Sequence, residues 1–168
     1  MEFRLVIGLG NSEPAYARTY HNAGFLFIDA LARLQGAPTD LPRNRLLKTS
    51  TAMNASGAFV ERTIRKLSAA PATLLVAHDD ADLALGTYRC SFGRGAAGHK
   101  GVADIIAKLN TKGFWRLRIG VRRAPPAQSA PRVRAGEFVL APISPEDMPV
   151  LLRALEEAAR DIARRFRA

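Results

Sequence analysis

Apolar runs alternate along this chain with apolar residues at helical spacing, which is typical of an α/β fold. Short apolar runs predict buried strands, and the clearest of them lies at 73–77. Strands are predicted at 3–8, 46–49, 73–77, 86–92 and 115–121, and helices at 23–34, 54–67, 102–109 and 144–168. Because the two kinds of element alternate, we expect a single α/β domain over residues 1–168, in which parallel strands end at a common edge.

Two stretches near the carboxyl end have distinct character. Residues 122–135 are rich in Arg, Pro, Ala and Ser and lack periodicity, which predicts a mobile basic loop. The helix predicted at 144–168 begins with a capping serine, Ser144, followed by a proline at its first helical position, Pro145. We therefore expect a well-defined C-terminal helix after an irregular loop.

Basic residues outnumber acidic ones, with 25 Lys and Arg against 15 Asp and Glu and a formal net charge of +10. Such a surplus on a small domain favours a polyanionic partner, with nucleic acid ahead of simple solubility. Residues 115–121 alternate apolar side chains with Arg116 and Arg118. The alternation predicts a half-exposed strand that turns both arginines outward as a basic face.

The single cysteine, Cys90, excludes an internal disulfide, and no Cys/His cluster has zinc-ligand spacing. These features favour a reducing cytoplasm. The N-terminus lacks the order of a signal peptide, and no apolar run approaches the length of a membrane span. We therefore expect a soluble cytoplasmic protein without membrane contact.

The loop after the first predicted strand concentrates polar side chains between a buried strand and a buried helix. It runs from Gly8 to Gly24 and presents Asn11, Tyr16 and His21. Its Gly-Leu-Gly start suggests dinucleotide binding, but Glu13 stands where the third glycine of that fingerprint would fall. The loop is therefore a better candidate for chemistry performed by side chains.

His21 gains significance from Asp79, which follows the neighbouring strand at 73–77. A carboxylate there could accept the Nδ1 proton of His21 and leave Nε2 to take a proton from water. The alternatives for the acidic stretch 78–82 are a metal loop or a solvated turn, and its oxygen-ligand spacing is incomplete. No serine lies in a nucleophile elbow and Cys90 lies within a strand, so hydrolysis by water is favoured over covalent catalysis.

Two further candidates have structural alternatives that the sequence leaves open. Asn54 is either an ordinary helix N-cap or a donor to a carbonyl or a water. The Gly98–Gly101 stretch at a helix start suits contact with phosphate or ribose through backbone N–H groups and Lys100, and it equally suits a tightly packed connection.

Several motifs occur together, in order, between residue 3 and about residue 142, and the chain resembles bacterial-type peptidyl-tRNA hydrolase in all of them. The first block is Gly8-Leu9-Gly10-Asn11 followed by Tyr16, Thr19, His21-Asn22-Ala23-Gly24-Phe25 and Asp29; the second is Met53-Asn54-Ala55-Ser56-Gly57; the third is His78-Asp79-Asp80-Ala81-Asp82-Leu83 with Gly86; the fourth is Gly98-His99-Lys100-Gly101; and the fifth is Arg116-Leu117-Arg118-Ile119-Gly120-Val121. Five ordered blocks are far more specific than any single one.

The resemblance implies a monomer with a mixed, mostly parallel twisted sheet flanked by helices, and hydrolysis of the ester that joins a peptide to the 3′ end of tRNA. It implies neither cofactor nor metal. By position, it makes His21 the base that activates water and Asp79 the group that stabilises its basic form, while Asn11 discriminates blocked from free aminoacyl groups. The remaining implied substrate or tRNA contacts are Tyr16, Met53 at the peptide groove, Asn54 with a catalytic role as well, His99 and Lys100.

The chain departs from the family pattern mainly at positions that affect substrate binding and not at the proposed base. Ser12-Glu13 replaces Pro-Gly, Tyr20 replaces arginine, Ala52 replaces phenylalanine and Lys100 replaces asparagine. The segment between Gly36 and Thr51 is shortened, which predicts the loss of a strand or hairpin at one sheet edge. Two hypotheses follow: an active hydrolase of peptidyl-tRNA, or a non-catalytic or weakly active RNA-binding relative.

Overall fold

A five-stranded sheet forms the centre of the molecule in the computed structural model, which describes residues 3–34, 43–123 and 134–165. The strands are β1 (Leu5–Gly8), β2 (Leu46–Lys48), β3 (Leu74–Ala84), β4 (Tyr88–Phe92) and β5 (Trp115–Arg122), in the order β2-β1-β3-β5-β4. All neighbours are parallel except β4 and β5, which are antiparallel. The predicted mixed, mostly parallel sheet is thus confirmed.

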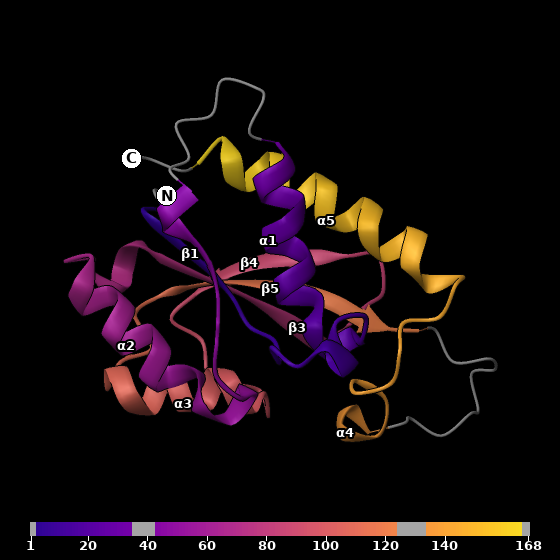
Figure 1. The fold of residues 1–168 in the computed structure, drawn as a ribbon, viewed down its shortest axis with the longest axis horizontal. Helices are drawn as coiled ribbons and strands as arrows, with labels where there is room; N and C mark the ends of the chain where they lie inside the picture. Colours follow the sequence, from indigo (N-terminus) through magenta and orange to yellow (C-terminus); the bar gives the residue numbers. More distant parts are fainter. Residues whose placement is uncertain (1–2, 35–42, 124–133, 166–168) are drawn as a thin grey trace.

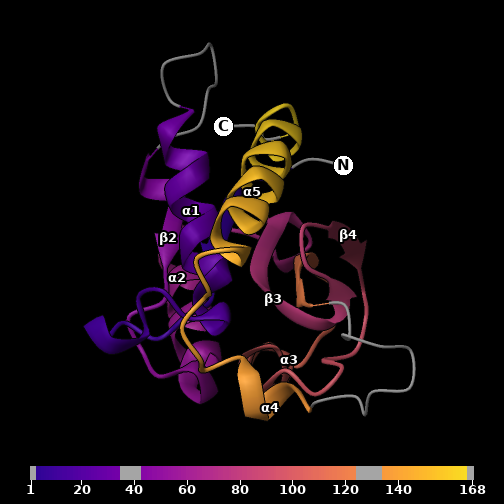
Figure 2. The same ribbon diagram turned by 90° about the vertical axis from the view of Figure 1, so that its right-hand side faces the viewer.

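Helices cover both faces of this sheet (Figure 1). The helices are α1 (Ala23–Arg33), α2 (Ser56–Lys66), α3 (Lys100–Leu109), the short α4 (Ala135–Phe138) and α5 (Asp147–Ala163). α1 and α5 pack together on one face, and α2 and α3 on the other (Figures 1 and 2). Three-residue 3₁₀ helices lie in the connections that follow β1 and β2, at Pro14–Tyr16, Tyr20–Asn22 and Met53–Ala55, and the last two lead directly into α1 and α2.

Alternation along the strands divides the core into two parts, one on each face of the sheet. In β1, Val6 packs toward α1 and α5, while Leu5 and Ile7 pack toward α2 and α3. The helices contribute buried residues to the two parts of the core, such as Leu31 of α1 and Ile105 of α3. Burial of apolar surface on both faces explains why the first and third strands are continuous apolar runs.

A glycine contact fixes where α1 begins relative to the sheet. A Cβ atom on Gly24 would lie 2.4 Å from the carbonyl oxygen of Ala77 and 2.5 Å from that of Leu9. A Cβ atom on Gly8 would lie 2.3 Å from the carbonyl oxygen of Gly24. The start of α1 therefore lies directly against the ends of β1 and β3, and the turn before it, which carries His21, is brought to β3.

The acidic stretch 78–82 lies within β3, so the prediction that the strand ends at Ala77 is wrong. The reason is β5, which continues to pair with β3 beyond the end of β1, through His78 and Asp79 to Asp80. A register irregularity follows between Asp80 and Ala84, where the carbonyl oxygen of Ala84 occupies the space of a Cβ on Gly120.

The half-exposed basic face predicted for residues 115–121 is also wrong in part. β5 lies between β3 and β4, so both of its edges are paired, and Arg116 is buried, with only 2% of it exposed. Its guanidinium donates a hydrogen bond to the carbonyl oxygen of Gly95 over 2.7 Å. Arg118 is partly exposed and pairs with Asp80. An alternating pattern cannot distinguish a surface arginine from one whose head group reaches a backbone acceptor.

Two helix starts differ in detail from their predictions. Asn54 lies within a 3₁₀ turn and Ala55 occupies the N-cap position of α2 without a side-chain cap, so Asn54 is not the N-cap. At α5 the Ser144 hydroxyl accepts a hydrogen bond from the Asp147 N–H over 3.2 Å, as the predicted cap would, although the regular helix begins only at Asp147.

The sheet ends in short strands at both edges. β2 has three residues, and its Lys48 lies 2.7 Å from the Asp29 carboxylate and over the ring of Phe25. β4 forms the opposite edge and carries the exposed Arg89. The shortened segment predicted at 36–51 falls partly on 35–42, and the basic loop predicted at 122–135 mostly on 124–133, both outside the described residues.

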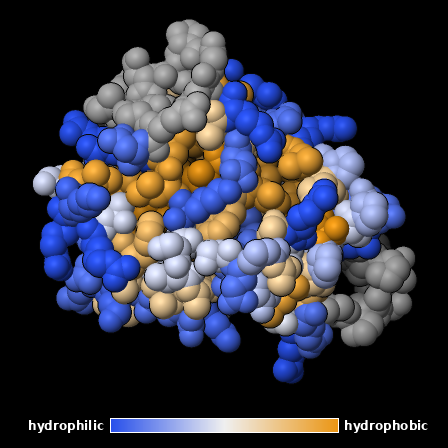
Figure 3. Space-filling model, in the orientation of Figure 1, coloured by the Kyte–Doolittle hydropathy of each residue, from blue (hydrophilic) through white to orange (hydrophobic). Residues whose placement is uncertain are grey.

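The surface seen in Figure 3 combines hydrophilic side chains around the rim with an apolar band across its middle. Within residues 3–34, 43–123 and 134–165, the longest helix is amphipathic, and no helix is both long and apolar enough to cross a membrane.

Replacing Gly24 with alanine should lower the free energy of unfolding by about 1–3 kcal/mol, because the added methyl would meet two backbone carbonyls that cannot move independently. Gly95→Ala is a matched control, since nothing lies within 4 Å of a Cβ at that position. Urea unfolding of the two variants measures the difference, and equal destabilisation would contradict the close packing.

Candidate active site

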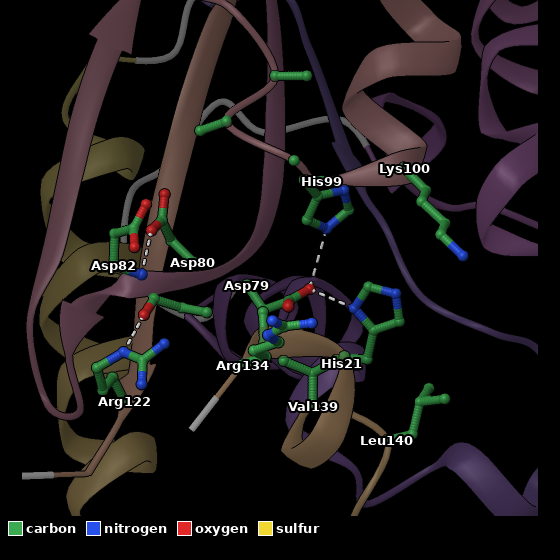
Figure 4. Close-up of a pocket in the computed structure, with 16 residues that line it drawn as sticks. His21, Asp79, Asp80, Asp82, His99, Lys100, Arg122, Arg134, Val139 and Leu140 are labelled. Carbon is green, nitrogen blue, oxygen red and sulfur yellow. Dashed lines mark hydrogen bonds and ion pairs between the residues drawn. The ribbon is translucent and has the colours of Figure 1, made fainter. Parts of the chain in front are cut away.

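A cavity of about 520 Å³ lies at the end of β3, between the His21 turn, the start of α3 and α4 (Figure 4). Its lining combines histidines, carboxylates and arginines with small and apolar residues. The lining residues are His21, Asp79, Asp80, Ala81, Asp82, Ala96, Ala97, Gly98, His99, Lys100, Arg122, Arg134, Ala135, Gly136, Val139 and Leu140.

His21 and Asp79 meet in this cavity, with Nδ1 of His21 lying 2.8 Å from Oδ1 of Asp79. Their side chains are 14% and 4% exposed, so the carboxylate is buried and the imidazole reaches toward the cavity. The turn that carries His21 is fixed by Asn22, whose side chain bonds both the N–H and the carbonyl of Asn11, over 2.8 and 3.0 Å. Two segments 58 residues apart thus form one ion pair or hydrogen bond.

A second histidine approaches the same carboxylate oxygen, with Nε2 of His99 lying 3.0 Å from Oδ1 of Asp79 (Figure 4). Nδ1 of His99 accepts the N–H of Val102 over 3.3 Å and so caps α3. An accepting Nδ1 places the proton of the neutral ring on Nε2, which therefore donates to Asp79. Reasoning from the sequence assigned His99 only to substrate, although a histidine at a predicted helix start is a signal for a cap.

Asp79 is held ionised by these neighbours. Burial alone would raise the pKa of its carboxyl, but the electrostatic interaction with His99 and the hydrogen bonds from both histidines outweigh burial and place the pKa well below its usual range. An ionised Asp79 must accept hydrogen bonds, so Nδ1 of His21 carries a proton and its Nε2 presents a lone pair.

The third histidine, His78, is buried behind this pair. Its Nδ1 donates to the carbonyl oxygen of Asp79 over 2.7 Å, and its ring packs edge-on against His99 with centroids 4.7 Å apart. Nε2 has no hydrogen-bond partner among the described residues. Burial first, and then the electrostatic interaction with His99, lower the pKa of His78 to about 3, so the ring is neutral in the folded protein.

The donor atoms of His21, Asp79 and His99 all lie within 4.8 Å of one another, close enough to surround a metal ion. Their hydrogen-bond directions favour a proton network instead. To ligate a metal through Nε2, His99 would have to carry its proton on Nδ1, which faces the N–H of Val102. The donor set therefore fits a metal poorly.

The structure places the other candidate residues at different depths around the cavity. Asn11 is partly buried, and its Oδ1 accepts the N–H of Met53 over 3.1 Å. Met53 is 6% exposed and its sulfur packs against Gly101. Tyr16 is partly exposed and Asn54 is exposed. Neither lines the cavity, and Asn11 and Met53 do not line it either. Lys100 is exposed, lines the cavity and begins α3 (Figure 4).

Several residues of the cavity were missed by reasoning from the sequence. Burial disfavours an ionised Asp80, but the hydrogen bond that it receives from Nε of Arg118 over 2.6 Å outweighs burial and lowers its pKa. Val139 and Leu140 form an apolar wall. The short apolar run after the basic loop could have indicated such a wall, but its position depends on contacts with the His21 turn.

Comparison with known proteins matches this arrangement to one family. A sequence profile described as peptidyl-tRNA hydrolase matches residues 5–167. This chain belongs to the peptidyl-tRNA hydrolase family. The peptidyl-tRNA hydrolase of Cupriavidus necator is 39% identical over 171 residues, covering 91% of this chain and 86% of the relative. That of Symbiobacterium thermophilum is 38% identical, covering 95% and 90%.

A crystal structure of peptidyl-tRNA hydrolase from Acinetobacter baumannii has a similar fold, with a TM-score of 0.78 and 30% identity. The match covers 95% of this chain and 86% of that structure. Membership of the peptidyl-tRNA hydrolase family confirms the resemblance. Among the positions where this chain departs from the family pattern, Ser12, Glu13 and Ala52 are exposed, whereas Tyr20 is buried.

Replacing His78 with asparagine should make stability less sensitive to acid. The unfolded chain protonates this histidine below about pH 6.5, whereas the folded protein keeps it neutral down to about pH 3. The unfolded state therefore binds more protons in this window, and wild-type stability falls as pH falls through it. The asparagine amide would still offer an N–H to the carbonyl oxygen of Asp79.

Between about pH 7.5 and about pH 5, the wild type should lose about 2 kcal/mol more unfolding free energy than His78→Asn. Urea unfolding of both proteins at the two pH values measures this difference. Parallel losses would show that His78 is not neutral in the fold.

Proposed function

We propose that this chain hydrolyses the ester between the peptide, or an N-blocked amino acid, and the 3′ end of tRNA. The observation that carries the proposal is the contact between Nδ1 of His21 and the ionised, buried Asp79 inside an open cavity. This contact leaves Nε2 of His21 as a base aimed at a water, and the cavity holds no serine or cysteine nucleophile among its described lining residues.

In this mechanism Nε2 of His21 takes a proton from water as the water oxygen attacks the ester carbonyl carbon. The tetrahedral intermediate then collapses, the bond to the ribose 3′ oxygen breaks, and His21 returns the proton to that oxygen. Asp79 stabilises the imidazolium that forms between the two transfers, because its carboxylate is buried beside Nδ1. His99 holds the carboxylate from its other side.

Asn11 and Asn54 supply amide groups around this centre. The Oδ1 atom of Asn11 is engaged by Met53, so its Nδ2 is the group that meets a carbonyl of a blocked substrate. Asn54 is exposed at the start of α2, and we assign it the donation of a hydrogen bond to the substrate carbonyl. Tyr16 and Met53 complete the peptide groove in this proposal, and His99 and Lys100 contact the tRNA end.

Binding of tRNA is supported by charge. A second hollow adjoins the first through Ala97 and is lined by Arg89, Arg94, Arg116 and Arg118. The whole chain carries a formal net charge of +10. Lys and Arg side chains neutralise phosphates, so affinity should fall steeply with salt. We further propose that the protein acts as a monomer in the cytoplasm, where its substrate is made, without a cofactor or a metal.

Replacing His21 with alanine should reduce kcat/KM for N-acetyl-phenylalanyl-tRNA by about 10²–10⁴-fold, because the base is removed. Release of the acetylated amino acid is measured with EDTA present, and tRNA affinity and circular dichroism should not change. Full activity of the variant would exclude His21 as the base. Tight tRNA binding by the wild type without any cleavage would instead identify a non-catalytic RNA-binding relative.

Replacing Asp79 with asparagine should lower kcat by at least about 10²-fold, because a neutral amide no longer stabilises the imidazolium. Asp161→Asn is a matched control: this carboxylate accepts a hydrogen bond from Tyr88 and does not line the cavity. Steady-state kinetics of both variants measure the effect. Equal kcat values would contradict the role of Asp79.

A further inference from the structure

The turn that carries His21 lies beside the segment that forms the apolar wall of the cavity. The His21 N–H donates to the carbonyl of Val139 over 2.7 Å, and Thr19 forms an antiparallel bridge with Pro142. The Ile143 N–H donates to the carbonyl of Arg18 over 2.8 Å. The wall and the base are therefore two sides of one small, irregular pairing outside the main sheet.

Tyr20 joins this pairing to the rest of the molecule through its side chain. Its hydroxyl donates to the Asp147 carboxylate at the start of α5 and receives the Ser144 N–H over 3.4 Å. Its ring packs edge-on against Phe138, with centroids 6.0 Å apart. Tyr20 and Asp147 are 6% and 5% exposed. The side chain next to the base is thus anchored on a buried carboxylate.

Arg123, which follows the end of β5, binds the same carboxylate. The contacts among Tyr20, Asp147 and Arg123 are called the anchor below. Nε of Arg123 lies 2.7 Å from the Asp147 carboxylate, and its Nη2 lies 3.2 Å from the Ser144 hydroxyl. Burial and then the bond to Asp147 raise the pKa of Tyr20, so its hydroxyl remains a donor. The Asp147 carboxylate therefore holds the His21 turn and the end of β5 with charge-assisted hydrogen bonds. Ser144, in the segment after the wall, is held by the Tyr20 hydroxyl and Arg123.

The wall depends on this anchor more than the base does. The imidazole of His21 is held independently by Asp79, and its turn by Asn22. Val139 and Leu140 lie in the turn after α4, which joins no strand of the main sheet as the structure describes it. Leu140 is 49% exposed, so packing alone restrains it little. Without the anchor, the wall would be held only by the burial of Val139, which is 7% exposed, and by its backbone bonds to the His21 turn, so Leu140 could shift while the proton network stays in place.

We propose that Tyr20, through Asp147 and Arg123, is a positioning residue that sets the apolar wall of the cavity for the acyl part of the substrate. The proposal rests on the function proposed above, because it assigns the cavity to that substrate. It predicts a change in substrate binding without a change in the chemical step, a separation that a general loss of stability does not produce.

The test compares Tyr20→Phe with Tyr88→Phe. Tyr88 offers a matched pair, since its hydroxyl lies 2.6 Å from the Asp161 carboxylate, joins β4 to α5 and does not line the cavity. Each variant loses one hydrogen bond from tyrosine to aspartate, so both should lower Tm. Only Tyr20→Phe should raise KM for N-acetyl-phenylalanyl-tRNA, by about tenfold with kcat retained.

Affinity for a tRNA analogue that carries N-acetyl-phenylalanine through a 3′ amide separates the two proposals, because this analogue cannot be hydrolysed as an ester. Its Kd should weaken by about tenfold in Tyr20→Phe and remain unchanged in Tyr88→Phe. If the wild type binds the analogue but cleaves no ester, the proposed function fails while the Kd values still decide the role of Tyr20.

Three results would overturn the proposal. The first is an unchanged KM and Kd in Tyr20→Phe despite a lower Tm, which would make the anchor merely structural. The second is a fall in kcat with KM unchanged, which would place the effect on the base. The third is an equal rise of KM in Tyr88→Phe.

Discussion

The buried carboxylate of Asp79 is the constraint on which the site depends. A charge removed from water is costly unless hydrogen bonds and opposite charge replace the lost hydration. Here His21 and His99 approach the same oxygen, and the strand backbone around Asp79 is held by pairing with β5. Each histidine must present a protonated nitrogen to the carboxylate, so one buried charge sets the proton positions of the whole cluster.

The fold brings these groups together through backbone contacts rather than through long side chains. β3 extends beyond β1 because β5 continues to pair with it, and this extension carries Asp79 past the end of the central sheet. The absence of a side chain at Gly24 lets α1 start against β3, so the His21 turn arrives at the same level. α3 then begins at His99, whose ring serves as helix cap and as donor.

Much of this could be predicted from the sequence, because apolar periodicity reports burial and burial defines strands and helices. The pairing of His21 with Asp79 followed from two strand ends at one sheet edge. The wrong predictions share a cause, because a sequence pattern describes the residues of one segment and not the groups that they contact in the fold. Arg116 is buried because the Gly95 carbonyl receives it, β3 is long because β5 pairs with it, and the cap at His99 depends on a tautomer.

The two outer strands have a consequence for encounters between copies of this protein. An exposed strand edge is a template on which another chain can add a strand, and long, flat, apolar edges invite such addition. β2 has only three residues and ends in Lys48, which pairs with Asp29. β4 carries the exposed Arg89. Short, charged edges of this kind disfavour the addition of a strand from a second copy of the chain.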